Sequence, residues 1–226
     1  MIVRTILTGP LLGILVLALL PVSPQATSSP RGAAPFAGKI KTLSADSRSR
    51  IKQHSWSPGC PVPLRKLRAV KVSHWNFEHR VVDGKLIVHQ RYAAPILRVF
   101  RQLHAKRFPI RRIEPIDAYR GDDHLSMDAD NTSAFNCRLV SGTGTWSRHA
   151  YGKAIDINPR ENPYVTPSGF VSPPGGRPYT DRKDVRKGMI VRRGPVARSL
   201  RRIAGWSWGG GWSGTKDYQH FSDNGR

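Results

Sequence analysis

Chemistry-bearing side chains are concentrated in two short stretches of the C-terminal half of the chain. The first stretch, residues 147–156, has the form SxHxxGxAxD and places an imidazole, His149, seven positions before a carboxylate, Asp156. Gly152 permits a turn between them, and the apolar run over 154–157 is typical of a buried strand that would hold Asp156 on a rigid element. We therefore expect His149 and Asp156 to face one ion.

The second stretch, Asp217 to His220, has the form DxxH and supplies another imidazole with a carboxylate beside it. Two histidines and one carboxylate, with a fourth position left for water, form the open tetrahedral arrangement of catalytic zinc. The sequence therefore predicts that Zn²⁺ is bound by His149, Asp156 and His220. Zinc of this kind activates water and polarises a carbonyl group, and Asp217 is placed to accept the proton from the water and deliver it to a leaving amine.

Together the two motifs closely resemble the signature of the D-alanyl-D-alanine carboxypeptidase and L-alanyl-D-glutamate endopeptidase family of zinc peptidases. The resemblance extends from about Gly59 to Phe221 and includes the segment NTSAFNCR at 131–138. It implies the same three zinc ligands, with Asp217 as the catalytic base. It also implies hydrolysis of the D-amino-acid-containing stem peptide of peptidoglycan, either by removing a terminal D-alanine or by cutting within the stem.

The resemblance further implies an upstream arginine that holds the substrate carbonyl and stabilises the oxyanion. Arg120 resembles the usual Tyr-Arg pair of the family, whereas Arg138 ends the NTSAFNCR segment and follows Cys137. We favour Arg138 slightly. Ser147, two residues before the first ligand, either hydrogen-bonds the substrate or a group around the metal, or simply caps a turn.

The remaining polar and aromatic candidates are assigned structural roles. A cluster of acidic residues fits no EF-hand spacing, so a solvated loop is favoured over a calcium site; its members are Asp122, Asp123, Asp128 and Asp130. The tryptophans at 206, 208 and 212 either line a substrate groove or pack in the core, and we expect at least one in the core. The other six histidines are treated as structural; they are His54, His74, His79, His89, His104 and His124.

Periodicity and turn residues predict the elements that hold these motifs. The turn dipeptide Asp83-Gly84 lies between two apolar runs, which predicts a hairpin with strands over 70–82 and 85–89. Apolar residues at helical spacing predict a helix over 93–107. A second helix is predicted over 195–204, because a proline opens it and a glycine follows it.

Strand-like composition is also found over 110–119 and 218–221. Residues 158–181 contain six prolines and several glycines, and we expect them to form a long surface loop. The fold class expected is α+β: a small antiparallel sheet backed by a few helices, with a zinc site at the sheet's edge of the type shared by hedgehog proteins and D-Ala-D-Ala peptidases.

Residues 1–26 combine a short basic start with an apolar run, and we assign them to a signal peptide, with an uncleaved anchor as the alternative. Residues 27–58 are rich in Ser, Pro, Ala and Lys and are assigned to a flexible linker, and 59–226 to the catalytic domain. The mature protein is then expected to be a monomer outside the cell or in the cell wall, without stable membrane insertion. In an exported chain the two cysteines, Cys60 and Cys137, are expected to form a disulfide, with two unrelated thiols as the alternative.

The net charge of +22 and the pI of about 11.1 indicate an anionic partner. The basic residues show no nucleic-acid-binding motif, so anionic cell-wall polymers are favoured over nucleic acid. A non-catalytic cell-wall-binding protein is one rival interpretation, and a signalling-type metal binder of the hedgehog kind is another. The presence of all three ligands and of Asp217 argues against the first, and the lack of a processing domain argues against the second.

Overall fold

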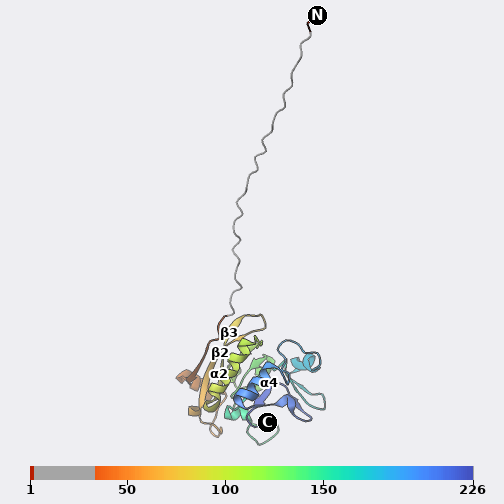
Figure 1. Cartoon of the computed structure of the whole chain (residues 1–226). Coiled ribbons are helices and arrows are strands. Elements are labelled where there is room, and N and C mark those ends of the chain that lie inside the picture. The colour runs from red at the N-terminus through yellow and green to blue at the C-terminus, as the bar shows by residue number, and fades with distance from the viewer. Residues whose placement is uncertain (3–33, 226) are drawn as a thin grey trace. The chain divides into compact units, whose positions relative to one another are not determined.

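A three-stranded antiparallel sheet forms the N-terminal half of the part of the chain that the computed structural model describes, residues 1–2 and 34–225. Its strands are β1 (Gly38–Thr42), β2 (Leu67–Trp75) and β3 (Val81–His89), in the order β1-β2-β3. The 16-residue helix α2 (Gln90–Ala105) follows directly and lies along the sheet (Figure 1). Within residues 34–225 no helix is both long and apolar enough to cross a bilayer.

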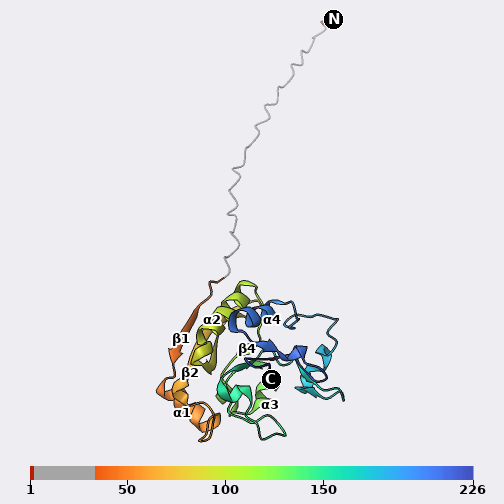
Figure 2. The same ribbon diagram turned by 60° about the horizontal axis from the view of Figure 1, so that its bottom comes forward.

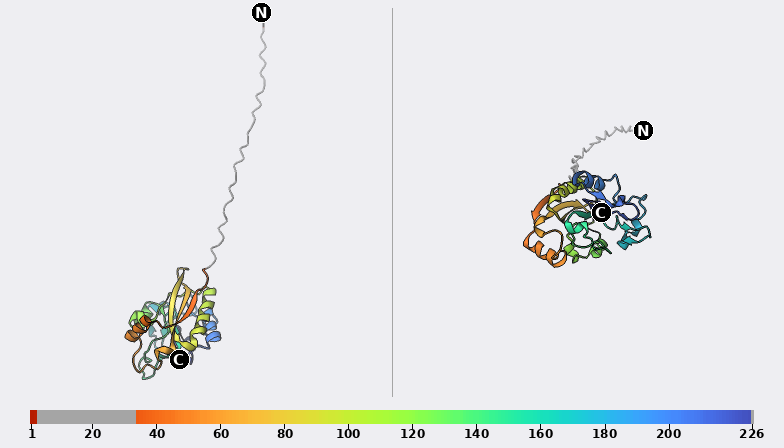
Figure 3. Two further views of the ribbon diagram at one scale, coloured as in Figure 1. Left: turned by 90° about the vertical axis from the view of Figure 1, so that its left-hand side faces the viewer. Right: turned by 90° about the horizontal axis from the view of Figure 1, so that it is seen from below.

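Both faces of this sheet are covered, because successive residues of a strand point to opposite sides. One face meets the apolar stripe of α2, whose Ile96, Phe100 and Leu103 recur at helical spacing and are buried in the larger core. The other face meets α1 (Ala45–His54), where Ile51 packs into a smaller cluster with Leu67. Figure 3 shows the sheet edge-on between the two helices.

The predicted linker over 27–58 is wrong for residues 38–54, because these residues form β1 and α1. β1 pairs with β2 along its whole length, and the side chain of Ser44 caps the start of α1. β1 has no fully buried side chain and α1 has two, Ser47 and Ile51, so apolar periodicity gives little signal there. The folded part therefore includes these residues, ahead of the start predicted at residue 59. The predicted signal peptide lies outside the described residues apart from Met1 and Ile2.

The predicted hairpin exists, but its turn lies elsewhere. β2 and β3 are antiparallel and joined by residues 76–80, where the Asn76 side chain accepts hydrogen bonds from the backbone N–H groups of Glu78 and Arg80. Gly84 instead lies inside β3, opposite Val72. A Cβ on Gly84 would lie 2.5 Å from the Cβ of Ile113, so this glycine serves close packing and not a turn.

Three small sheets and several short helices form the C-terminal half, which confirms the α+β class. Strands β6 (Ala154–Asp156), β11 (His220–Ser222) and β9 (Ser207–Trp208) form one antiparallel sheet in the order β6-β11-β9. A second antiparallel sheet has the order β10-β7-β8, with β10 at Lys216–Asp217, β7 at Tyr164–Val165 and β8 at Val171–Ser172. A parallel pair joins β4 (Arg112–Ile113) and β5 (Asn131–Thr132).

The helices of this half are short. α3 spans Asp123–Asp128 and α4 spans Pro195–Ser199, and a π-helical turn over Leu200–Ala204 continues α4 (Figure 2). The second predicted helix is thus confirmed over 195–204. Single turns of 3₁₀ helix lie at Leu64–Lys66, Ile116–Tyr119, Arg148–Tyr151, Pro174–Tyr179 and Gly209–Gly211.

Two further predictions need correction. The strand expected over 110–119 is limited to β4, because Pro115 cannot donate a ladder hydrogen bond and a 3₁₀ turn follows it. Residues 158–181 are not a long surface loop, since they contain β7, β8 and a 3₁₀ turn. The buried side chain of Asn162 anchors them, because it donates to the carbonyl oxygen of Gly188 and accepts from the N–H of Ile190.

Cys60 and Cys137 form a disulfide with Cα atoms 6.0 Å apart, as the sequence predicts. The bond joins the loop after α1 to the segment that precedes Arg138. Trp206 is 1% exposed and belongs to the larger core, which confirms the expectation that at least one of the three C-terminal tryptophans is a core residue.

A buried histidine, His74 on β2, should make folding stability depend on pH. His74 is 3% exposed, and neither of its ring nitrogens has a hydrogen-bond partner among the described residues. Burial lowers the pKa of His74 from 6.5 to about 4, a shift that Asp83 opposes and His104 increases. The unfolded chain therefore binds this proton more tightly, and stability should fall as the pH drops from about 6.5 to about 4.

The expected loss over this range is about 3 kcal/mol, since each pKa unit corresponds to about 1.4 kcal/mol. Urea unfolding at about pH 7.5 and about pH 4 measures it. Other groups also titrate over this range. The change in the free energy of unfolding between the two pH values is therefore compared between the wild type and His74→Leu, with His124→Leu, at an exposed position, as the control. An equal pH dependence in His74→Leu and the wild type would contradict the assignment.

Candidate metal centre

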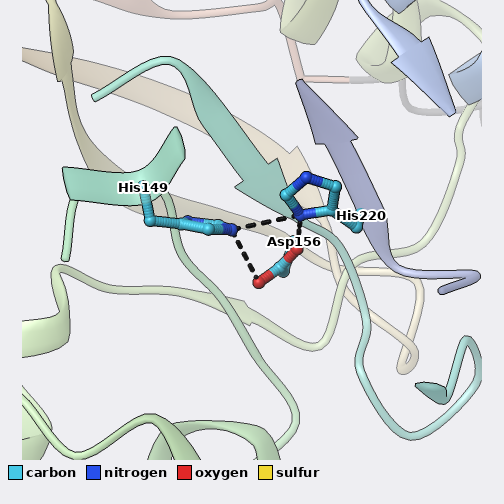
Figure 4. Close-up of side chains that lie close together, drawn as sticks. All are labelled: His149, Asp156 and His220. Carbon is cyan, nitrogen blue, oxygen red and sulfur yellow. Dashed lines mark hydrogen bonds and ion pairs between the residues drawn. The ribbon is translucent and has the colours of Figure 1, made fainter. Parts of the chain in front are cut away.

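The register of one pair of strands brings two of the predicted ligands together. His220 of β11 lies directly opposite Asp156 of β6, and opposed residues of an antiparallel pair project from the same face with Cβ atoms about 5 Å apart. Nδ1 of His220 is 3.0 Å from Oδ1 of Asp156 (Figure 4). The two residues are 64 positions apart in the sequence, so the contact depends on strand pairing.

His149 comes from the 3₁₀ turn over Arg148–Tyr151. Ser147 is the N-cap of this turn, and its Oγ accepts a hydrogen bond from the N–H of His149, as the capping alternative predicts. Gly152 ends the turn at φ 65°, and a Cβ there would lie 2.7 Å from the backbone nitrogen of His89. Glycine at this position therefore satisfies both the backbone conformation and the packing.

A buried hydrogen bond orients the His149 ring. Nδ1 of His149 lies 2.5 Å from the carbonyl oxygen of Ala134, which can only accept a hydrogen bond. The Nδ1 atom must therefore carry the proton, and the lone pair of Nε2 is directed at Asp156 and His220 (Figure 4). This is the tautomer that a metal ligand requires.

The three ligand atoms surround one point. Nε2 of His149 is 3.1 Å from Oδ2 of Asp156 and 3.2 Å from Nδ1 of His220. Nitrogen and oxygen ligands of tetrahedral zinc lie about 3.3 Å from one another. All three residues are buried, and they are the single group of metal-binding type found among the described residues. The predicted ligand set therefore fits zinc.

Asp156 is held in the ionised form that metal binding needs. Burial by itself would raise the pKa of its carboxyl group, but electrostatic interaction with the imidazole groups of His149 and His220 outweighs burial and holds the pKa below its ordinary value. The β6 backbone at Asp156 is fixed as well, since it exchanges two hydrogen bonds with Ser133.

Asp217, the predicted base, is in a different environment. Its Oδ1 atom is buried without a hydrogen-bond partner among the described residues. Burial raises the pKa of Asp217 to about 7, a shift that His220 opposes and Asp156 increases. A bound dication would lower this pKa, because positive charge favours the ionised carboxylate. The carboxyl group thus lies close to the ligands and has a free oxygen that can accept a proton.

The segment predicted to be a surface loop positions Asp217. Asp217 of β10 pairs with Tyr164 of β7. The guanidinium of Arg182 donates to the carbonyl of Ile190 and lies 4.3 Å from the ring centre of Tyr218, so it ties residues 158–190 to the residue next to the base. Gly209 also packs against Asp217. A Cβ atom added to Gly209 would lie only 2.6 Å from the carbonyl oxygen of Asp217.

Of the two candidate arginines, Arg138 lies within electrostatic reach of Asp217. Its positive charge lowers the pKa of Asp217, and its guanidinium forms an ion pair of 2.8 Å with Asp123. Arg120 is exposed and ends the 3₁₀ turn over 116–119 in the left-handed conformation. The preference for Arg138 thus has support from electrostatics, which sequence reasoning did not use.

The acidic residues at 122–130 do not form a solvated loop. Asp122 caps α3 through its side chain, Asp123 pairs with Arg138, and Asp130 is 2% exposed beside Arg111 and Glu161.

Two groups beside the ligands were not found from the sequence. The Ala134 carbonyl that orients His149 belongs to the backbone and therefore has no residue-type signal. The ring of Trp212 lies with its centre 5.9 Å from the centre of the His220 ring.

A buried His, Asp, His site with a second carboxyl group beside it is the arrangement expected of a zinc metallopeptidase. Residues 141–223 match the family model described as D-alanyl-D-alanine carboxypeptidase, which confirms the resemblance to this family of zinc peptidases that act on cell-wall peptides. The matched range holds His149, Asp156, Asp217 and His220, whereas both candidate arginines precede it. No curated protein and no solved structure gives a significant match to the chain.

The metal centre predicts one tightly bound zinc ion per chain. His149→Ala and His220→Ala should each weaken zinc binding by more than about 100-fold, because even groups outside the ligand set contribute about 10- to 100-fold. Metal analysis after dialysis and competition with a chromogenic chelator measure this. His124→Ala, which removes an exposed histidine of α3, is the matched control. Stoichiometric zinc in both ligand variants would refute the site.

Proposed function

We propose that this protein is a secreted zinc metallopeptidase that hydrolyses amide bonds in peptidoglycan stem peptides, with the D-Ala-D-Ala carboxypeptidase reaction as its activity. The observation that carries the proposal is the convergence of His149, Asp156 and His220 beside the buried, unpartnered oxygen of Asp217. Cleavage between L-alanine and D-glutamate within the stem is the alternative reaction, since the same residues serve both bonds.

Each residue has a distinct task in this proposal. Zinc, when bound by the three ligands, supplies a Lewis acid that polarises the scissile carbonyl and activates water. Asp217 accepts the proton that the attacking water loses as its oxygen bonds to the carbonyl carbon. The same carboxyl group then gives the proton to the amine nitrogen as the carbon–nitrogen bond breaks. Arg138 offers a positive charge to the oxygen that becomes negative in the tetrahedral intermediate.

Export rests on separate observations. The Cys60–Cys137 disulfide supports it, because such bonds persist in oxidising compartments. The apolar run within residues 1–26 supports it as a signal peptide. A purely wall-binding role is disfavoured, because a binding protein has no use for a buried carboxyl group with a raised pKa next to a complete set of metal ligands.

The reaction is tested on purified muropeptides, with products followed by mass spectrometry. Release of alanine from a pentapeptide stem identifies the carboxypeptidase reaction, and loss of the whole D-glutamate-containing fragment identifies the endopeptidase reaction. Asp217→Asn should lower kcat by about 10²- to 10⁴-fold, because the proton acceptor is lost, while zinc content stays unchanged. Full activity in Asp217→Asn, or in the chelated wild type, would disprove the mechanism.

A second experiment separates the two arginines. Arg138→Gln should lower kcat by about 10²- to 10³-fold, which is the usual effect of removing one oxyanion-stabilising donor. Arg120→Gln, the matched control, should change kcat by less than about 3-fold, since Arg120 is exposed and, unlike Arg138, does not contribute to the pKa shift of Asp217. If Arg120→Gln showed the larger loss, the assignment of Arg138 would be reversed.

A further inference from the structure

Helices α2 and α4 lie side by side (Figures 1 and 2) and carry exposed basic side chains without acidic ones. The chain has no Asp or Glu between Asp83 and Glu114, and none between Asp184 and Asp217. We call this surface the α2–α4 basic face; its exposed residues are Arg98, Arg101, Lys106, Arg198, Arg201 and Arg202.

The charges of the basic face have no counter-charge within the described part of the chain. None of its six side chains forms an ion pair there, whereas Arg148 is paired with Asp223 and Arg138 with Asp123. Like charges on two packed helices repel one another, and this repulsion is relieved when an anion binds. The arrangement is therefore that of an anion-binding surface.

The two helices also form a shallow pocket on this face. A depression of about 350 Å³ lies between them. Three basic side chains line it together with two polar and two half-buried apolar ones; the lining residues are Lys106, Arg198, Arg202, Gln102, Ser199, Pro195 and Ile203. Guanidinium groups bind phosphate oxygens with two parallel hydrogen bonds, and lysine adds a point charge. Phosphate groups therefore suit this lining better than isolated carboxylates do.

The lack of exposed apolar side chains on the basic face favours one class of polyanion over a bilayer or a nucleic acid. The large apolar side chains exposed on the folded part lie elsewhere, at Leu125, Leu139, Val140, Phe170 and Val185. The basic face thus offers no apolar anchor for a bilayer and no exposed aromatic ring for nucleobases. A flexible phosphodiester polymer needs neither.

The basic surface continues toward the metal centre. Nη2 of Arg192, which precedes α4, lies 3.9 Å from the position that a Cβ on Gly211 would occupy. Gly211 belongs to the 3₁₀ turn that packs against β10, the strand of Asp217, and Trp212 follows it beside His220. A polymer bound along the face would hold the protein with its metal centre close to the wall.

We propose that the α2–α4 basic face binds an anionic, phosphodiester-linked polymer of the cell wall and retains the enzyme beside its substrate. The identity of the polymer rests on the proposed function, which places the protein at the wall. Binding itself does not require hydrolysis, so the two proposals can fail separately.

The test measures binding of the full chain to deacylated lipoteichoic acid, a poly(glycerol phosphate), by fluorescence anisotropy over a range of salt concentrations. The triple variant Lys106→Gln, Arg198→Gln and Arg202→Gln should bind at least about 10-fold more weakly at physiological ionic strength. Its plot of log affinity against log salt should be less steep by about 2, as expected when three phosphate contacts are lost.

The control triple variant Arg48→Gln, Lys52→Gln and Arg65→Gln removes the same charge from exposed positions outside this face and should bind within about 2-fold of the wild type. Both variants should hydrolyse a soluble stem peptide at the wild-type rate, so loss of binding with intact hydrolysis isolates the face. Equal weakening in the control would overturn the proposal, because it would show diffuse attraction. Tighter, face-dependent binding to phosphatidylglycerol vesicles or to a DNA duplex would overturn it in favour of a membrane or nucleic acid.

Discussion

The pairing of β6 with β11 is the contact on which the candidate site depends. It sets Asp156 opposite His220, and it sets Ile155 opposite Phe221 on the other face of the same two strands. Ile155 and Phe221 are fully buried in the larger core. A slip of one residue in either strand would expose the apolar side chain of that strand and turn its ligand into the core, so burial of the apolar pair specifies the register of the metal ligands.

The site holds two carboxyl groups in opposite electrostatic states. Asp156 is surrounded by two imidazoles and stays ionised, whereas burial raises the pKa of Asp217 to about 7. Neighbouring carboxyl groups whose surroundings separate their pKa values can serve different tasks in one reaction. Here the difference suits one group to permanent metal binding and the other to gaining and losing a proton.

The sequence predicted the metal ligands and the strand of Asp156 better than it predicted the N-terminal elements and residues 158–181. The ligands were found because their residue types and spacing are tied to zinc chemistry, and the Ala154–Asp156 strand because its apolar residues are buried. β1 was missed because it is held by backbone pairing without a fully buried side chain, and α1 because it buries only Ser47 and Ile51. The role of residues 158–181 was missed because prolines indicate local irregularity but do not reveal that Tyr164 pairs with Asp217.

The base and the metal ligands are supported by different parts of the fold. Asp156 and His220 belong to the sheet β6-β11-β9, whereas Asp217 belongs to the sheet β10-β7-β8, whose position is set by the proline-rich segment and by Arg182. Under the proposed mechanism, damage to that segment would displace Asp217 and leave the three metal ligands in place. A full complement of bound zinc would then be no measure of an intact active site.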